Sequence, residues 1–361
     1  MPRRLLAILL LCVTLTAAAG CGDDSRELGD DATLRVYVSL PLRGPSGGDG
    51  RDAADGARLA LADAGGKAGG AAIEAVYRDA ADADGWSPVR SAANARAAIQ
   101  DSTAIAYLGD FESGATRASL PVTNEARMLQ VSPASGAVDL VASELGSDDV
   151  PDVQPTGERT FGRVIPADDA QAAAAAAWAA ELRADRVAIE SDRSAFARSL
   201  ADGFQLAAGR EGVTVSGANA PLSYLAGRPA PRGGREIGSD AYLLPPGQHA
   251  PAMATSAALD PSQLPPAGQE FARAFEDEYG RAPGRYAAYG YEAMAAILAS
   301  IERASDPGDR PAVVAAFFET ADRRSVLGGY SIDEVGNTTL GRMTGYRVEG
   351  AKLNPVASLR P

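Results

Sequence analysis

Residues 104–136 read AIAYLGDFESGATRASLPVTNEARMLQVSPASG, and this stretch decides the fold class. Its two short apolar runs, Ala104–Leu108 and Met128–Val131, are interpreted as strands. The segment Gly114–Glu125 between them is interpreted as a helix. A strand, a helix and a second strand in this order predict a parallel sheet flanked by helices, because parallel neighbours need a crossover connection.

The same alternation continues on both sides of this stretch. Before it we predict strands at Leu34–Leu40 and Ala71–Tyr77 and helices at Ala53–Ala64 and Trp86–Gln100. After the polar loop Pro151–Arg159, a second set is predicted: strands at Phe161–Val164, Val187–Glu190, Val213–Ser216 and Ala241–Leu244, and helices at Ala167–Leu182, Ala195–Glu211, Glu270–Tyr279, Tyr286–Ala304 and Pro311–Thr320. Residues 217–240, rich in Gly, Pro and Arg, are interpreted as a loop, and residues 326–349 as short strands. A chain of this length exceeds one comfortable core, so two α/β lobes are expected.

Residues 1–20 resemble an export signal rather than part of the fold. Arg3 and Arg4 precede an apolar run that ends near Leu15 and is too short to span a bilayer. Small residues then lead to Cys21, as in a bacterial lipobox, where the cysteine is acylated. The simpler alternative is an ordinary secretory signal with a chance cysteine. Residues 21–32 are polar and predict a flexible tether.

Composition excludes several classes of function. The net charge is −13, and removal of residues 1–20, which carry two arginines and no acids, takes it to −15. Such an acidic surface disfavours nucleic acid as a partner. With Cys12 in the signal and Cys21 lipidated, the mature chain has no disulfide and no cysteine-based metal site. The single histidine, His249, disfavours a Ser-His-Asp triad, and no metal or cofactor is expected.

Small and hydroxyl residues follow the predicted strands of residues 104–136. In open parallel sheets, ligands bind beyond the carboxyl ends of the strands. Glu112-Ser113-Gly114 precedes a predicted helix, whose first N–H groups can hold a carboxylate, and Ser135-Gly136 offers a similar arrangement. Ser113 and Ser135 are equally well explained as helix N-caps.

A family resemblance favours the ligand-binding interpretation. The strings Leu108–Ser113 and Pro133–Ser135, together with Leu40–Gly47, Arg285–Ala293 and Gly328–Asp333, resemble the type I periplasmic binding proteins. Within these, the chain looks most similar to the leucine and branched-chain amino-acid binding group of ABC transporter lipoproteins. The resemblance implies two Rossmann-like lobes with parallel sheets flanked by helices, joined by a three-crossover hinge. It implies a first lobe of residues 33–159 and 283–331 and a second of residues 160–282 and 332–361.

The resemblance also implies how a ligand is held. In this family, positions matching Ser113, Ala134, Ser135 and Gly136 hold the ligand's carboxylate and amino group, and an aromatic at the position of Phe196 packs on it from the second lobe. Closure of the lobes then presents the ligand to a membrane permease.

One departure from the family pattern bears on the ligand. About one βαβ unit, on the order of 30 residues, is predicted to be missing between Leu259 and Pro265, and with it the carboxylate that pairs with a ligand ammonium. Glu112 could replace it, although a solvated loop acid is the simpler interpretation. Gln248 and His249 could line the cleft or belong to a surface loop.

Three functions are weighed on these grounds. The first is an extracytoplasmic solute-binding lipoprotein of an ABC importer, anchored to the outer face of the cell membrane through Cys21, with a small amino-acid-like, carboxylate or amide ligand. The second is a ligand sensor or a degenerate scaffold on the same fold. An enzyme is disfavoured because no nucleophile–base pair can be assembled. The predicted loss of the carboxylate leads us to expect that small carboxylates, amides or aromatic acids bind more tightly than leucine, isoleucine or valine.

Overall fold

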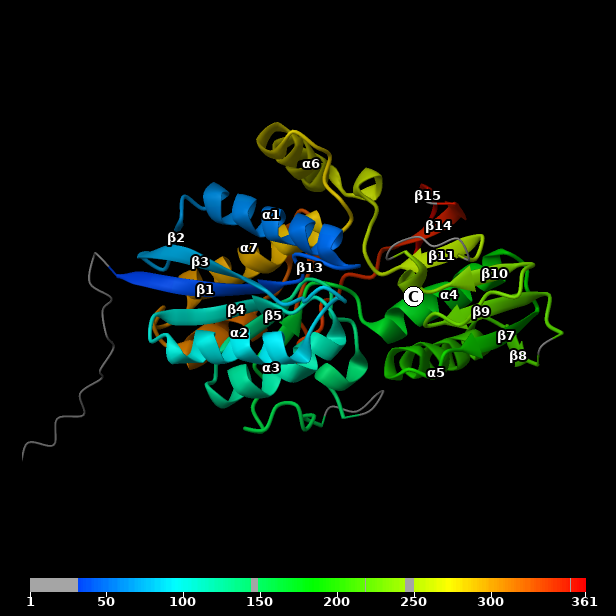
Figure 1. Ribbon diagram of the computed structural model, residues 1–361, viewed down its shortest axis with the longest axis horizontal. Coiled ribbons are helices and arrows are strands. Elements are labelled where there is room, and N and C mark those ends of the chain that lie inside the picture. The colour runs from blue at the N-terminus through cyan, green and yellow to red at the C-terminus, as the bar shows by residue number, and fades with distance from the viewer. Residues whose placement is uncertain (1–31, 144–148, 218, 244–249, 351) are drawn as a thin grey trace, which may run out of the picture.

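The computed structural model describes residues 32–143, 149–217, 219–243, 250–350 and 352–361. In this part of the chain, two parallel-dominated sheets flanked by helices form two lobes, which lie side by side in Figure 1. The predicted α/β fold class is therefore confirmed. The predicted signal peptide, Cys21 and almost all of the tether lie outside the described residues.

The first sheet has the strand order β2-β3-β1-β4-β5-β6. Its pairs are parallel except for β2 with β3. The strands are β1 (Thr33–Leu40), β2 (Lys67–Ala68), β3 (Ala71–Asp79), β4 (Ala104–Gly109), β5 (Leu129–Ser132) and β6 (Phe161–Arg163). The helices of this lobe are α1 (Gly47–Asp63), α2 (Pro88–Gln100), α3 (Ser113–Glu125), α6 (Pro266–Tyr279), α7 (Ala287–Arg303) and α8 (Arg310–Phe318). A short 3-10 helix, η1 (Val138–Leu140), follows β5.

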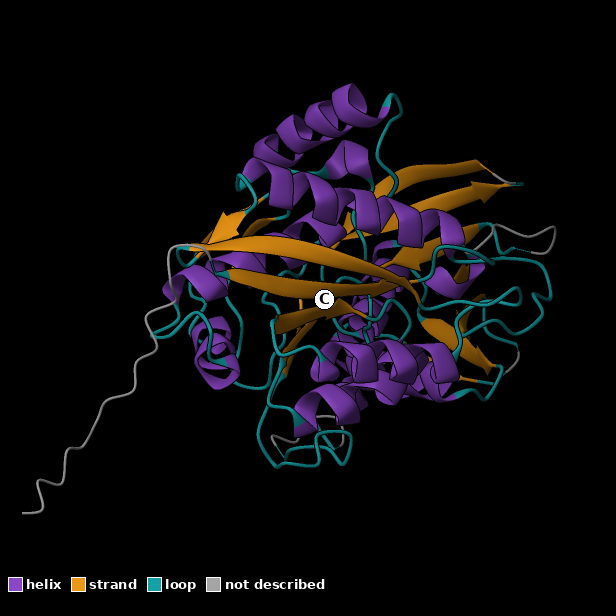
Figure 2. Cartoon of the chain, turned by 60° about the vertical axis from the view of Figure 1, so that its left-hand side comes forward, coloured by secondary structure: helices purple, strands orange, loops and turns teal. Residues whose placement is uncertain are grey.

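Helices cover both faces of the first sheet, as the turned view of Figure 2 shows. Val36 and Val38 of β1 pack in the cluster that includes α1, α7 and α8, whereas Tyr37 between them packs with residues of α2. Helices α1 and α7 meet through glycines: a Cβ on Gly56 would lie 1.9 Å from the carbonyl oxygen of Ala287. The close approach of these two helices therefore requires a residue without a side chain at this point.

The second sheet has the strand order β15-β14-β11-β10-β9-β7-β8. Its strands are β7 (Arg186–Ser191), β8 (Thr214–Ser216), β9 (Leu222–Ala226), β10 (Glu236–Gly238), β11 (Met253–Ser256), β14 (Met343–Glu349) and β15 (Lys352–Leu359). Helices α4 (Asp168–Glu181) and α5 (Ala195–Arg210) pack on one face, and the short 3-10 helices are η2 (Asp240–Tyr242) and η3 (Pro261–Gln263). On the opposite face, the described residues form only a small apolar cluster of Leu243, Ala254 and Tyr346.

Two predictions for the second lobe are wrong. Residues 217–240, interpreted as a loop, contain β9 and β10, which lie in the middle of the sheet. No strand forms at Ala241–Leu243, where the 3-10 helix η2 (Asp240–Tyr242) ends. The missing segment was therefore predicted at the wrong place, after Leu259, because the parallel strands β9, β10 and β11 are all present in this sheet. What is short is the connection from β9 to β10, Gly227–Arg235, which contains no helix.

The chain passes between the lobes three times, through residues 164–167, 257–265 and 331–342. This matches the predicted three-crossover hinge. The lobe boundaries themselves stay a prediction, but β6 pairs with β5, so the first sheet extends past the predicted boundary at residue 159. Phe271 and Phe275 of α6 also pack in the core of the first lobe, not the second. The small sheet of β12 (Arg323–Ser325) and β13 (Gly328–Tyr330) precedes the last crossover.

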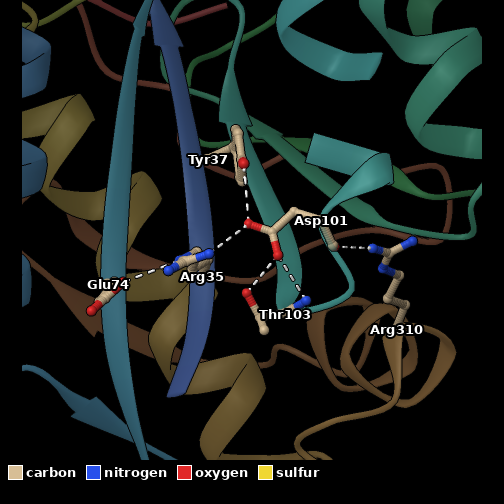
Figure 3. A network of polar contacts seen from close by, with 6 residues as sticks. All are labelled: Arg35, Tyr37, Glu74, Asp101, Thr103 and Arg310. Atoms are coloured by element: carbon tan, nitrogen blue, oxygen red, sulfur yellow. Dashed lines mark hydrogen bonds and ion pairs between the residues drawn. The ribbon is translucent and has the colours of Figure 1, made fainter. Parts of the chain in front are cut away.

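A network of polar contacts around Asp101 lies at the amino end of the first sheet (Figure 3). The Asp101 carboxylate accepts hydrogen bonds from Thr103 N–H at 2.9 Å and its hydroxyl at 2.6 Å, and from Arg35 Nη1 and the Tyr37 hydroxyl at 3.1 Å. Arg310 donates to the backbone carbonyl of Asp101 at 3.2 Å. Desolvation alone would raise the pKa of Asp101, but these hydrogen bonds outweigh it and lower the pKa to about 2.

Candidate functional site

The loops that follow β1, β4 and β5 meet at one edge of the first sheet, because these strands are parallel neighbours. The Ala137 N–H, in the loop after β5, donates to the hydroxyl oxygen of Ser113, at the start of α3, at 3.1 Å. The structure thus brings together the two loops in which ligand-binding serines were predicted. Their contact with a ligand stays a prediction.

Ser135 is fully buried and its hydroxyl is already engaged by the protein. It lies 2.7 Å from the Thr116 hydroxyl and donates to the carbonyl oxygens of Asp110 and Phe111 at 3.1 and 3.2 Å. The N–H groups of Ala134 and Ser135 both donate to the Ser132 hydroxyl. These bonds tie the β5 loop to the β4 loop, so Ser135 holds the shape of the site whatever it does toward a ligand.

Gly136 is the point where the second lobe touches this edge of the first. Its carbonyl accepts from the Asp168 N–H at 2.8 Å, and a Cβ at Gly136 would lie 2.1 Å from Asp168 Oδ1. The family resemblance predicted that Gly136 helps to hold a ligand. The structure shows a different partner, since the carboxyl group at the start of α4 occupies that space.

Glu112 is not the solvated loop acid that was the simpler interpretation. Both carboxyl oxygens are buried, and neither has a hydrogen-bond partner among the described residues. Desolvation raises the pKa of Glu112 to about 7, and repulsion by Asp110 adds to it. The Ser46 hydroxyl lies near enough to favour the charged form, although it makes no hydrogen bond of acceptable geometry.

Of the other predicted site residues, Phe196 and Ala134 lie in the described part of the chain. Phe196 lies in the first turn of α5, half-buried against the core of the second lobe. Gln248 and His249 lie outside the described residues, as does the lipidation site Cys21. Ala134 lies in the β5 loop beside the core of the first lobe.

Residues of the second lobe that the sequence did not suggest face the same edge. Asp240 lies two residues after the end of β10, at the carboxyl end of the second sheet, and begins η2. Desolvation raises its pKa to about 6, while Arg285 opposes this rise. The second lobe therefore brings carboxyl groups of its own to this edge, those of Asp168 and Asp240, in addition to Glu112 of the first lobe. The predicted loss of the carboxylate that pairs with a ligand ammonium stays a prediction. The signal for Asp240 was hidden because β10 was interpreted as part of a loop.

Arg285 joins the lobes at this point. It donates to Asp49 Oδ2 at 3.0 Å, from α1 of the first lobe, and to the carbonyl of Leu243 at 3.2 Å, from the second. Its guanidinium lies 5.6 Å from the ring centroid of Tyr286, which in turn packs edge-on against Phe111 at 4.6 Å. These contacts place Arg285 and two aromatic rings beside the loop that carries Glu112.

The site is acidic, and several of its buried polar groups lack a hydrogen-bond partner among the described residues. Burial raises the pKa of Asp168 to about 7, with repulsion from Asp240 adding to the shift. Buried atoms without a hydrogen-bond partner in the described structure include Asp168 Oδ2, Gln171 Oε1, the Tyr224 hydroxyl and Arg285 Nη1. Such groups are costly when left unpaired, so they indicate a place where an external molecule completes the bonding.

Other features of the described chain do not coincide with this edge. A cavity of about 420 Å³ lies at the hinge, lined in part by Leu259, Tyr289, Gly328 and Arg342, and it shares no residue with the predicted site. No group of three or more acidic, histidine or cysteine side chains in the described ranges could hold a metal ion. None of the described helices is long and apolar enough to span a membrane.

Two α/β lobes, three crossovers and a polar edge between them define a solute-binding protein of the two-lobed type. The chain belongs to the periplasmic binding protein family, whose model matches residues 33–224. No curated protein sequence matches the chain.

Solved structures share the fold. The chain is similar to the leucine-binding protein LivK of Thermotoga maritima, with 21% identity and a TM-score of 0.74 over 91% of this chain and 99% of that one. It is similar to LivJ of Streptococcus pneumoniae, solved with isoleucine (18% identity, TM-score 0.70, 91% and 100% covered). It is also similar to a solute-binding protein of Rhodopseudomonas palustris, solved with 3,4-dihydroxybenzoic acid (18%, 0.71, 91% and 98%). These likenesses confirm the predicted type I periplasmic binding fold.

Proposed function

We propose that this protein is the extracytoplasmic solute-binding lipoprotein of an ABC importer. It captures a small amino-acid-like, carboxylate or amide ligand between its lobes, closes by hinge rotation and presents the ligand to a permease. Family membership and the likeness to LivK and LivJ support this role.

The observation that carries the proposal is a set of buried polar groups, contributed by both lobes, that lack a hydrogen-bond partner among the described residues. Glu112 comes from the first lobe and Asp168, Gln171 and Tyr224 from the second. Polar groups buried in an ordinary protein core are usually hydrogen-bonded to other protein groups. In a site that closes on a ligand, such groups stay available for hydrogen bonds to the ligand.

A thermal-shift screen of amino acids, small acids and amides tests the capture of a solute, because binding to the folded state raises the melting temperature. The expected result is a shift of several degrees for at least one compound, abolished in a variant of the cleft such as Asp240→Ala. A screen with no shift for any compound would contradict the proposal.

Membrane anchoring through Cys21 rests on the small residues that precede it after an apolar run. Cells that express the Cys21→Ala variant should release the protein from the membrane fraction, while a Cys12→Ala control should stay anchored. A Cys21→Ala protein that remains fully in the membrane fraction would remove the lipoprotein part of the proposal.

The second candidate is a ligand sensor or a scaffold that no longer binds. The connection Gly227–Arg235, which lacks a helix, favours it, because one face of the second lobe is left with few apolar contacts. Uptake of the ligand found in the screen, compared between cells with and without the gene, separates the two. Unchanged uptake would favour the sensor.

A further inference from the structure

Glu112 is placed as an N-cap but does not act as one. It precedes the first residue of α3 in extended conformation, yet its side chain makes no capping hydrogen bond. Capping is the usual local use of a polar side chain at this position. With that use absent and both oxygens buried without a partner in the described chain, the carboxyl must be explained by something outside the helix.

The arginines on neighbouring elements hydrogen-bond to groups other than Glu112. Arg43 pairs with Asp79 at 2.5 Å, Arg51 donates to the Leu42 carbonyl at 2.6 Å, and Arg117 pairs with Asp139 at 2.5 to 2.9 Å. Arg285 is held through Nη2 by Asp49 and by the Leu243 carbonyl, while its buried Nη1 has no hydrogen-bond partner among the described residues. Among the described residues, the one charged group that acts on Glu112 is Asp110, which repels it.

Apolar and aromatic groups surround the same loop. Trp86, about 40% exposed, lies over Gly114, where a Cβ would come within 2.5 Å of its ring. Phe111 packs against Tyr286 on the other side of Glu112 in sequence. Aromatic faces attract cations, so these rings suit the same ligand group as the carboxylate does.

We propose that Glu112 is a specificity-determining residue of the first lobe and binds a cationic or N–H-rich end of the ligand. The inference rests on the proposed capture of a solute between the lobes and narrows its ligand class. A buried carboxylate without a donor is costly, and a ligand ammonium, guanidinium or amide removes that cost. Asp168 and Asp240 on the opposing lobe add negative charge, which disfavours a simple carboxylate in the same space.

The test uses three probes on one carbon skeleton: 4-methylpentan-1-amine, 4-methylpentanamide and 4-methylpentanoate. Binding is measured by calorimetry at pH 6 and pH 8 on the wild-type protein, on Glu112→Gln, and on Glu278→Gln, an exposed acid of α6, as a matched control. The amine stays charged at both pH values, since an alkylammonium has a pKa of about 10.

At pH 8 the amine should bind most tightly and the carboxylate least. Glu112→Gln should weaken amine binding by about tenfold to a hundredfold, and Glu278→Gln should leave it unchanged. The amine should bind about tenfold more weakly at pH 6 than at pH 8 in the wild type, because Glu112 becomes protonated, and Glu112→Gln should lose this dependence. Tighter binding of 4-methylpentanoate, strengthened at pH 6, would mean that a protonated Glu112 donates to an anion and would overturn the proposal.

A ligand-free measurement decides the matter if no probe binds. Glu112→Gln should melt at a higher temperature than the wild type at pH 8 and lose that advantage at pH 4, because the substitution removes an unpaired charge. A lower melting temperature at pH 8 would make Glu112 a structural residue and overturn the proposal. A compound from the wider screen that binds wild type and Glu112→Gln equally would overturn it too, while leaving the proposed function intact.

Discussion

At the amino end of the first sheet, the Asp101 carboxylate accepts hydrogen bonds from Thr103, Arg35 and Tyr37, whereas at the carboxyl end both oxygens of Glu112 lack a described partner. The first arrangement lowers the pKa of Asp101 to about 2, and the second raises that of Glu112 to about 7. Desolvation acts against the charge at both sites, so the difference lies in the donors that the protein provides.

Asp101 is therefore an acid that stabilises the fold, whereas Glu112 is an acid that stays available to bind a ligand. Donors around Asp101 come from β1 and from the turn before β4, so the carboxylate ties sheet elements together. Around Glu112, Arg43, Arg117 and Arg285 pair with the carboxylates of Asp79, Asp139 and Asp49 instead. The Asp101 network therefore stabilises the amino end of the first sheet, and binding is expected at the carboxyl end, which faces the second lobe.

Substitution of Asp101, whose carboxylate is held by several hydrogen bonds, should have the largest effect on stability. Asp101→Ala leaves the donors of Arg35, Tyr37 and Thr103 without their acceptor and should lower the free energy of unfolding at pH 7 by about 3 kcal/mol. Urea denaturation measures this. Glu74→Ala, which removes only the exposed partner of Arg35, should cost about 0.5 kcal/mol or less. Equal losses in the two variants would break the comparison.

The pH dependence of stability should reveal both kinds of acid. The pKa of Asp101 is lowered, so its contribution is present above pH 4 and is lost as the pH falls toward 2. The pKa values of Glu112 and Asp168 are raised to about 7, so burying these acids costs no stability below about pH 4. The cost grows as the pH rises from about 4 to 7 and levels off above 7.

The ligand-free protein should therefore be most stable near pH 4 to 5 and lose about 2 kcal/mol by pH 8. Urea midpoints across this range provide the measurement, and Glu112→Gln should flatten the decline. A stability that rises steadily from pH 5 to pH 8 would contradict the assignment of these acids.

Two glycines of the site offer a test of the contact between lobes. A Cβ at Gly136 meets the buried Asp168 carboxyl, so Gly136→Ala should cost about 1 to 3 kcal/mol. At Gly114 a Cβ meets only the half-exposed Trp86 ring, which can move, so Gly114→Ala should cost less. The double variant Gly136→Ala, Asp168→Ala should be less destabilised than the sum of its single changes, as a double-mutant cycle would show. Strict additivity would argue against the contact.

The smallest effect concerns the two serines. Ser135→Ala removes a buried hydroxyl that bonds the β4 loop and Thr116 of α3, and it should cost about 1 to 2 kcal/mol of stability. Ser113→Ala removes one acceptor, for the Ala137 N–H, and should cost less while weakening a bound ligand. Thermal melts and calorimetry on both variants measure the two quantities. Ser113→Ala with unchanged affinity would leave Ser113 as part of the loop scaffold.

Several features of the site were accessible from the sequence because they depend on local pattern. Apolar runs separated by amphipathic segments predicted β1, β4 and β5 and the helices between them. Parallel strand order then places the loops with Ser113 and Ser135 at one edge, and the bond between Ala137 and Ser113 agrees with this. The strands β9 and β10 were missed because they are short and flank the Gly, Pro and Arg residues of their connection.

Periodicity and chain direction were therefore enough to predict the α/β class, the two lobes, the order of the main elements of the first lobe and the edge at which its loops gather. Only the tertiary structure decided which polar groups are satisfied. The burial of Glu112 and the approach of Asp168 to Gly136 depend on segments distant in the chain, and so does the position of Asp240 beside Arg285. Residue type sets what a side chain can bond, but the neighbours that desolvate or pair it are assembled by folding.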